Sequence, residues 1–155
     1  LKLAWIAGLG PEPALAEAFA RLEVVNDLFL SASAPAQLAA AAALAARHAI
    51  QAQILERLQM NLAALDSALA RLPSLQRLRV EGGWTVLLRL PRIHSDAAWA
   101  ERLVERAGVL THPGHFYGMT EESHLALSLI PPPAEFAAGI ARLCAAAAAE
   151  LTADS

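Results

Sequence analysis

The stretch GVLTHPGHFYGMTEESHLALSLIPPP, residues 108–133, decides the fold of the C-terminal half of the chain. Residues 109–111 are β-formers, and Pro113-Gly114 is a pair typical of turns. From residue 125 to residue 129 leucine alternates with alanine and serine, which is the period of a half-buried strand. The prolines at 131–133 then end that strand, because proline donates no hydrogen bond to a sheet ladder. The stretch therefore predicts a strand, a tight turn, a loop and a second strand.

Helical patterns precede this stretch. Apolar residues recur at spacings of three and four over residues 13–29, which predicts an amphipathic helix. A serine- and proline-containing break at residues 31–35 separates it from a second predicted helix over residues 35–46. A single apolar stripe over residues 50–72 predicts a third helix of more than six turns, long enough to span a small domain.

The period of the pattern changes to two after this long helix. Residues 75–81 and 84–90 predict two strands joined by the flexible pair Gly82-Gly83. Two further helices are predicted over residues 95–107, with a Ser-Asp cap, and over residues 134–151. We therefore predict an α+β fold, in which helices pack on a small, mostly antiparallel sheet of three to four strands, with a long central helix.

Length and charge limit the classes of function. A chain of 155 residues fits a single domain over residues 1–155, and a net charge of −3 without a basic stripe argues against nucleic-acid binding. Cys144 is the lone cysteine, so no intrachain disulfide can form. The uncharged run 28–46 has about the length of a membrane span, but its alanine, proline and serine content favours a soluble helix. We expect a cytoplasmic protein with no membrane partner.

The hydrophobic opening LKLAWIAG, residues 1–8, predicts a short strand over residues 1–7. A strand this apolar is normally covered on both faces, and a small domain offers no obvious cover. We therefore expect these eight residues to be a strand that belongs with a larger, missing N-terminal domain.

The residues alone indicate no catalytic centre. His112 and His115 flank a Pro-Gly pair, and no sulfur or acidic ligand stands at a fitting interval, so no metal site is predicted. Glu121-Glu122 fits a solvated loop, and Gly8-Leu9-Gly10 is too short a signal for a phosphate-binding loop. Composition and spacing alone predict a soluble α+β domain and no specific function.

The order of the motifs goes further. The chain resembles the C-terminal part of fold-type I, pyridoxal-phosphate (PLP) dependent aminotransferases of class I/II. The motifs that carry the resemblance are LKLAWIAG (1–8), SASAPAQ (31–37), GGWTVLLRLP (82–91), AGVLTHPGHFYG (107–118) and HLALSL (124–129). The resemblance implies the small domain of an enzyme that transfers an amino group between an amino acid and a 2-oxo acid. It also implies PLP as cofactor, a homodimer, and a large domain as partner.

The resemblance also implies roles for single residues. The lysine that forms the Schiff base with PLP would precede residue 1, so we expect this chain alone not to hold PLP and assign it no catalytic residue. Lys2 falls at a position that contacts the cofactor phosphate, although a solvent-reaching lysine is an equal interpretation. Ala126 stands where many members carry an arginine for the substrate carboxylate. His124 is a weak substitute for it or a plain exposed histidine.

Further substrate contacts are implied near the pocket edge. Ser33 would lie at the edge of the partner subunit's site, and Phe29 near the substrate side chain, which suggests an apolar substrate; a helix cap and a core residue are the plain alternatives. Trp84 and Tyr117 border the pocket or pack the sheet. An alternative function is the ligand-sensing domain of a MocR/GntR-type transcriptional regulator, and a third is an unrelated interaction domain.

Overall fold

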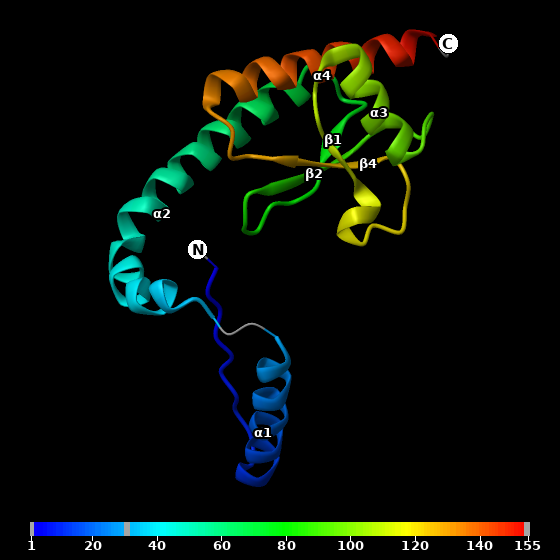
Figure 1. Ribbon diagram of the computed structural model, residues 1–155. Coiled ribbons are helices and arrows are strands. Elements are labelled where there is room, and N and C mark those ends of the chain that lie inside the picture. Colours follow the sequence, from blue (N-terminus) through cyan, green and yellow to red (C-terminus); the bar gives the residue numbers. More distant parts are fainter. Residues whose placement is uncertain (1, 30–31, 154–155) are drawn as a thin grey trace. The chain divides into compact units, whose positions relative to one another are not determined.

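The computed structural model describes residues 2–29 and 32–153 (Figure 1). The elements in chain order are α1 (Glu12–Leu28), α2 (Ala34–Leu69), β1 (Gln76–Arg77), β2 (Thr85–Arg89), α3 (Asp96–Ala107), β3 (His112–Pro113), η1 (Gly114–Tyr117), β4 (His124–Ser128) and α4 (Pro133–Ala153). Helices packed on one small sheet confirm the predicted α+β class. Leu1 of the predicted first strand and Ser31 of the predicted break lie outside the described residues.

The chain forms two compact units, and the expectation of a single domain over residues 1–155 stays a prediction. The N-terminal unit is Leu1–Ile50 and the C-terminal unit is Gln51–Ser155. Helix α2 begins in the first unit and ends in the second. The association of residues 1–8 with a missing domain stays a prediction.

The N-terminal unit contains an extended segment and α1. Residues 2–9 form neither helix nor strand, so the described part of the strand predicted over residues 1–7 is not observed; a strand needs a hydrogen-bonded neighbour. The segment passes close to α1 at Gly8, where a Cβ atom would lie 2.9 Å from Leu15 Cδ2 and 3.0 Å from Phe19. Only glycine permits this approach without a shift of the neighbouring side chains. None of the residues of α1 is buried.

Helix α2 joins two helices that the sequence predicted separately. The helix continues through residues 46–50, because Arg47, His48 and Ala49 include no glycine, proline or N-capping residue. Burial increases along the C-terminal unit's part of the helix. Ile54 and Leu58 are half-buried, whereas Leu65 is fully buried.

The sheet has the strand order β1-β2-β4-β3, and every neighbouring pair is antiparallel. Strands β2 and β4 confirm the predicted strands over residues 84–90 and 125–129. Of the strand predicted over residues 75–81, only β1 forms. Gly83, at φ +72°, and its neighbours form the bend between β1 and β2.

The strand predicted over residues 109–111 is wrong, because the strand forms later in the chain. Gly108, in the left-handed conformation at φ 59°, ends α3, and Val109 N donates back to Leu103 O at 3.1 Å. Residue 109 is therefore still engaged in the helix cap and cannot begin a strand. Strand β3 forms at His112–Pro113, and the predicted Pro-Gly turn becomes the short 3₁₀ helix η1, which ends at Gly118.

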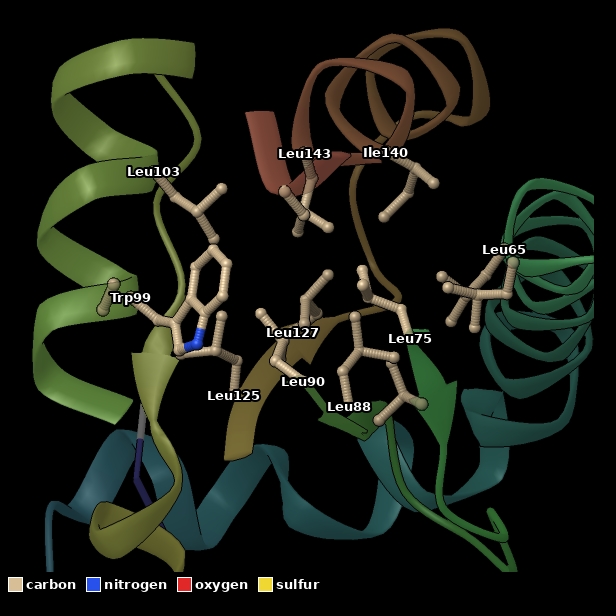
Figure 2. Close-up of a cluster of buried hydrophobic side chains, with 14 of the residues drawn as sticks. Leu65, Leu75, Leu88, Leu90, Trp99, Leu103, Leu125, Leu127, Ile140 and Leu143 are labelled. Carbon is tan, nitrogen blue, oxygen red and sulfur yellow. The ribbon is translucent and has the colours of Figure 1, made fainter. Parts of the chain in front are cut away.

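The core lies between one face of the sheet and α2, α3 and α4. Figure 1 shows α3 and α4 over the same face of the sheet. Figure 2 shows Leu125 of β4 near Trp99, and Leu88 of β2 near Leu75. Val86, Leu88, Leu125 and Trp99 are fully buried there. Burying one side chain of this size contributes about 1.5–3 kcal/mol to the stability of the folded protein. The apolar faces of the strands and of the helices meet in this core.

Two helices, α2 and α4, are long and apolar enough to cross a membrane by length and composition. This is weak support for a span, since core helices pass the same test. Helix α4 places Phe136, Ile140 and Leu143 in the core. Burial in the core accounts for only part of its apolar composition, since 28% of its most apolar window is buried.

Candidate functional site

The sheet face opposite the core is the candidate site. Along β4 the side chains alternate, so Leu125 and Leu127 enter the core while His124, Ala126 and Ser128 lie on the opposite face. We call this second side the open face of the sheet. The residues predicted at positions 124 and 126 thus share one face, as the sequence indicated.

The strand register places particular residues beside Ala126. Its Cα partner on β2 is Leu87, and its Cα partner on β3 is His112. Directly opposite residues in an antiparallel pair project from the same face, so all three lie on the open face. Arg89 lies on the same face, two residues along β2 and opposite His124. Its guanidinium donates to the side-chain oxygen of Gln76 on β1.

His124 is buried, which corrects the interpretation of an exposed histidine. It is 3% exposed, and its Nδ1 lies 3.1 Å from the carbonyl oxygen of Glu121. Gly114 of η1 approaches it so closely that a Cβ atom there would lie 2.6 Å from His124 Cβ. The 3₁₀ helix therefore covers His124, and this residue is ill placed to meet a ligand directly.

His112 and Tyr117 form a pair beside Ala126. The Nδ1 atom of His112 lies 3.1 Å from the Tyr117 hydroxyl oxygen, and the two rings are stacked with centroids 6.1 Å apart and an angle of 27° between their planes. His112 is exposed, and Tyr117 is 47% exposed. The predicted substrate residue Tyr117 is thus at the open face, whereas the sequence pattern singled out His112 only as a weak metal candidate. The signal for His112 is the register of β3, which no pattern in the sequence predicts.

His115 belongs to a different pair, with Asp96 at the start of α3. Asp96 is 6% exposed and accepts hydrogen bonds from His115 N at 3.0 Å and Ala97 N at 3.0 Å, and His115 Nδ1 lies 2.7 Å away. Burial acts to raise the pKa of Asp96, but the hydrogen bonds and charge of His115 outweigh it and hold that pKa below its usual range. This pair fastens η1 to α3.

A buried glutamate fastens the two helices of the core. Glu150 of α4 is 6% exposed, lies 2.9 Å from His94 Nε2, and accepts hydrogen bonds from Arg102 of α3 at 3.1 and 3.2 Å. Arg106 forms a further ion pair with it. The hydrogen bond with His94 and the two arginine charges hold the pKa of Glu150 below its usual range, against the effect of burial. We interpret this cluster as structural.

The residues predicted from the N-terminal unit form a separate group. Lys2 and Ser33 are exposed, Phe29 is 72% exposed, and the Ser33 carbonyl accepts from Gln37 N at 3.1 Å at the start of α2. The structure does not place the two units relative to one another. The predicted residues Lys2, Phe29 and Ser33 are therefore not brought together here with those of the open face.

The residues fit a cofactor only in part. The exposed ammonium of Lys2 suits a phosphate as a point charge, and no side chain of the described residues forms an ion pair with it. Within residues 2–29 and 32–153, no three side chains of the metal-binding types gather. The role of Lys2 at a cofactor phosphate stays a prediction, as do the substrate contacts on the open face.

Comparison with known proteins identifies the family. The sequence profile described as aminotransferase class I and II matches residues 3–143, whereas a comparison with curated protein sequences found no match. Solved structures share the fold. The alanine aminotransferase from Pyrococcus furiosus has a TM-score of 0.78 and 18% identity over 90% of this chain and 36% of its own. The probable N-succinyldiaminopimelate aminotransferase from Thermus thermophilus has a TM-score of 0.72 and 25% identity over 84% of this chain and 35% of its own.

A third structure, the alpha-aminoadipate aminotransferase from another strain of Thermus thermophilus, was solved with N-(5'-phosphopyridoxyl)-L-leucine. It has a TM-score of 0.71 and 23% identity, covering 88% of this chain and 36% of its own. The chain thus spans about a third of the length of these structures. The match to the family profile covers most of the 155 residues, and the chain belongs to the class I and II aminotransferase family, whose members depend on PLP.

Proposed function

We propose that this chain is the small domain of a PLP-dependent aminotransferase, which moves an amino group between an amino acid and a 2-oxo acid. The observation that carries the proposal is the family match over residues 3–143. The sheet geometry supports it, since one face is sealed by the core and the other presents histidine, tyrosine and arginine side chains. Family membership alone does not fix the reaction, so the residues must be tested.

PLP, when bound, supplies the chemistry that accepts and returns the amino group. The residues of this chain would bind the cofactor phosphate and orient the substrate. Lys2 would hold the cofactor phosphate, Ser33 and Phe29 would border the substrate, and Tyr117 would line the pocket on the open face. The 72% exposure of Phe29 leaves an aromatic surface free to contact a ligand, which favours an amino acid with an apolar side chain.

The assembly implied by this proposal includes more than the chain. A large domain would provide the lysine that anchors PLP, and two copies would form a homodimer in the cytoplasm. Closure of the small domain over the site would exclude water from the reacting groups. We propose that the 155-residue chain alone neither holds PLP nor turns over substrate.

The test uses the complete protein that carries this chain. We expect the purified protein to show visible absorbance from bound PLP, which changes when an amino acid with an apolar side chain is added, with release of the corresponding 2-oxo acid. The 155-residue chain alone should change the absorbance of PLP, with or without the amino acid, no more than buffer does. A complete protein that binds no PLP would contradict the proposal.

A second function is favoured by one observation. Position 126 carries a methyl group and no charge on the open face, which suits a domain that binds a ligand without turning it over. Such a domain serves as the sensor of a MocR/GntR-type regulator. A complete protein that binds PLP and duplex DNA, and releases no 2-oxo acid from any amino acid, would select this alternative.

A further inference from the structure

The proposed amino acid and 2-oxo acid substrates share a carboxylate, whose negative charge needs a favourable environment in the site. Strands β1, β2, β3 and β4 contain no Asp or Glu residue, so no position of these strands repels an anion on the open face. His112 and Arg89 are exposed basic residues of the open face. A small carboxylate would therefore find the open face electrostatically favourable.

Ala126 determines where on this face a ligand can approach the sheet. Its Cα partners are Leu87 and His112, so a methyl group stands between two longer side chains. Ala126 is 4% exposed, so only a small part of its methyl group is open to a ligand. A ligand resting over this methyl group would touch Leu87 on one side and His112 on the other. Directly opposite Cβ atoms in a sheet lie about 4.5–5.5 Å apart.

The imidazole of His112 is held in place by two independent constraints. Its backbone is paired with Ala126 in the sheet, and its Nδ1 atom is 3.1 Å from the Tyr117 hydroxyl. When the phenol donates its proton to Nδ1, the neutral imidazole must carry its own proton on Nε2. The Nε2–H group is then an available donor, and a carboxylate is its natural acceptor. In the opposite arrangement Nδ1–H donates to the phenol oxygen and Nε2 carries no proton, so the His112 variants test which arrangement the protein uses.

Arg89 is the competing candidate for the same role. It lies on the open face, yet its guanidinium is directed to Gln76 on β1, away from β3. Its position opposite His124 is also offset by two residues from Ala126 along β4. Arg89 therefore contributes positive field to the face, while His112 is the nearer donor.

We propose that His112, positioned by Tyr117, binds the carboxylate of the amino acid and 2-oxo acid over Ala126. This inference rests on the proposed aminotransferase function and assigns the carboxylate contact within it. His112 is a binding residue and Tyr117 is a positioning residue. Both come from the continuous segment formed by β3 and η1.

The first experiment replaces His112 by phenylalanine in the complete protein. Phenylalanine keeps an aromatic ring for the stacking with Tyr117 but has no donor. We expect KM for the preferred amino acid to rise about tenfold or more, with a smaller change in kcat, because a hydrogen bond to a charged group is lost. Competitive inhibition by acetate should weaken by a similar factor. Circular dichroism and thermal unfolding that match those of the wild type would show that the variant is folded.

Further variants separate the roles. Tyr117→Phe, which keeps the ring and loses the hydroxyl, should raise KM by about threefold to fivefold through loss of one neutral hydrogen bond. Ala126→Arg in the His112→Phe background should recover most of the acetate inhibition, because a guanidinium at the neighbouring position pairs with a carboxylate. His48→Phe, on the exposed surface of α2, is the matched control and should leave KM unchanged.

The outcomes distinguish this inference from the proposed function. If the wild-type protein turns over amino acids and His112→Phe leaves both KM and acetate inhibition unchanged, the carboxylate assignment is overturned while the aminotransferase function stands. If Arg89→Gln raises KM and His112→Phe does not, the assignment is likewise overturned in favour of Arg89. If no amine is turned over, titration of acetate by calorimetry decides. Equal heat for wild type and His112→Phe, or none for either, overturns the inference.

Discussion

Helices α1 and α4 were both predicted from apolar residues at helical spacing, but the two helices differ in burial. Helix α4, in the C-terminal unit, buries Phe136, Ile140, Leu143 and Ala147 against the sheet. Helix α1, in the N-terminal unit, has no buried residue. Periodicity thus predicts that a helix forms, while burial decides how much that helix stabilises the protein. The stability of this chain should reside in the C-terminal unit, and each prediction below tests that difference.

The largest effect is expected from Trp99, at the centre of the C-terminal core. It is fully buried, and its indole Nε1 donates to the carbonyl oxygen of Pro91 at 3.1 Å. Trp99→Ala should lower the free energy of unfolding by about 3–5 kcal/mol through lost burial and a cavity. Phe29→Ala, at a side chain that is 72% exposed, should change it by less than about 0.5 kcal/mol.

Urea unfolding of the 155-residue chain, followed by circular dichroism, measures both variants. A loss of unfolding free energy for Phe29→Ala close to that for Trp99→Ala would contradict the difference in stability between the two units. It would mean that the aromatic side chain of the N-terminal unit is as well packed in solution as the core.

Alanine substitutions at two glycines of the C-terminal unit should change the free energy of unfolding in opposite directions. A Cβ atom at Gly114 would lie 2.6 Å from His124 Cβ and 2.9 Å from His124 O, so Gly114→Ala must push η1 away from β4. We expect a loss of about 1–3 kcal/mol. A Cβ atom at Gly139, inside α4, would meet nothing within 4 Å, so Gly139→Ala should stabilise by about 0.5–1 kcal/mol.

Thermal unfolding of the two glycine variants provides the measurement, and each serves as the control for the other. A Gly114→Ala variant as stable as the wild type would show that η1 is not packed on His124 as the structure describes. That outcome would also remove the support for a buried His124.

The pH dependence of stability should come from the C-terminal unit. The pKa of Glu150 is held below its usual value in the folded protein, mainly by the hydrogen bond with His94 and by two arginines. A carboxylate with a lowered folded pKa stabilises the protein above its unfolded pKa, about 4.3, and loses that contribution as the pH falls through the folded value. Glu150→Gln should therefore flatten the decline in stability below about pH 4.3. Part of the decline would remain, because the pKa of Asp96 is also lowered, and the hydrogen bond from Arg77 lowers the pKa of Asp66.

The control for this experiment is Glu101→Gln, at an exposed position of α3. Unfolding by urea at a series of pH values compares the two variants with the wild type. If both variants show the same acid profile as the wild type, the Glu150 cluster does not stabilise the folded state in the way that its contacts indicate.

Much of the fold was predictable because its signals are local. The helix over residues 95–107 needed only a Ser-Asp cap, an apolar stripe and a glycine, and α3 matches it closely. Strand β4 needed only the alternation of residues 125–129. The N-terminal strand failed because a strand depends on a neighbour, and nothing in residues 1–7 specifies one.

The candidate site was only partly predictable, because it depends on register. The sequence placed Tyr117, His124 and Ala126 near one another, but a side chain's face and cover depend on which strand it meets. The burial of His124 follows from the close approach of Gly114, which lies in η1, well before it in the chain. The role of His112 follows from its pairing with Ala126 across β3 and β4. Neither the approach of Gly114 to His124 nor the pairing of His112 with Ala126 can be predicted from the local pattern of residues.

The last prediction concerns the helix caps and limits the comparison of the two units to a single hydrogen bond. Ser95 caps α3 in the C-terminal unit, where its Oγ accepts from Ala98 N at 3.2 Å, whereas Pro11 at the start of α1 makes no side-chain cap bond. Ser95→Ala should lower the free energy of unfolding by about 1 kcal/mol. Pro11→Ala, the matched control, should leave the unfolding of the C-terminal unit unchanged, because it removes no hydrogen bond and lies in the other unit. Urea unfolding followed by Trp99 fluorescence, with Trp5 and Trp84 replaced by phenylalanine in every variant, reports on the C-terminal core. A loss for Pro11→Ala as large as that for Ser95→Ala would show that the two units unfold together, and the stability assigned to the second would then belong to both.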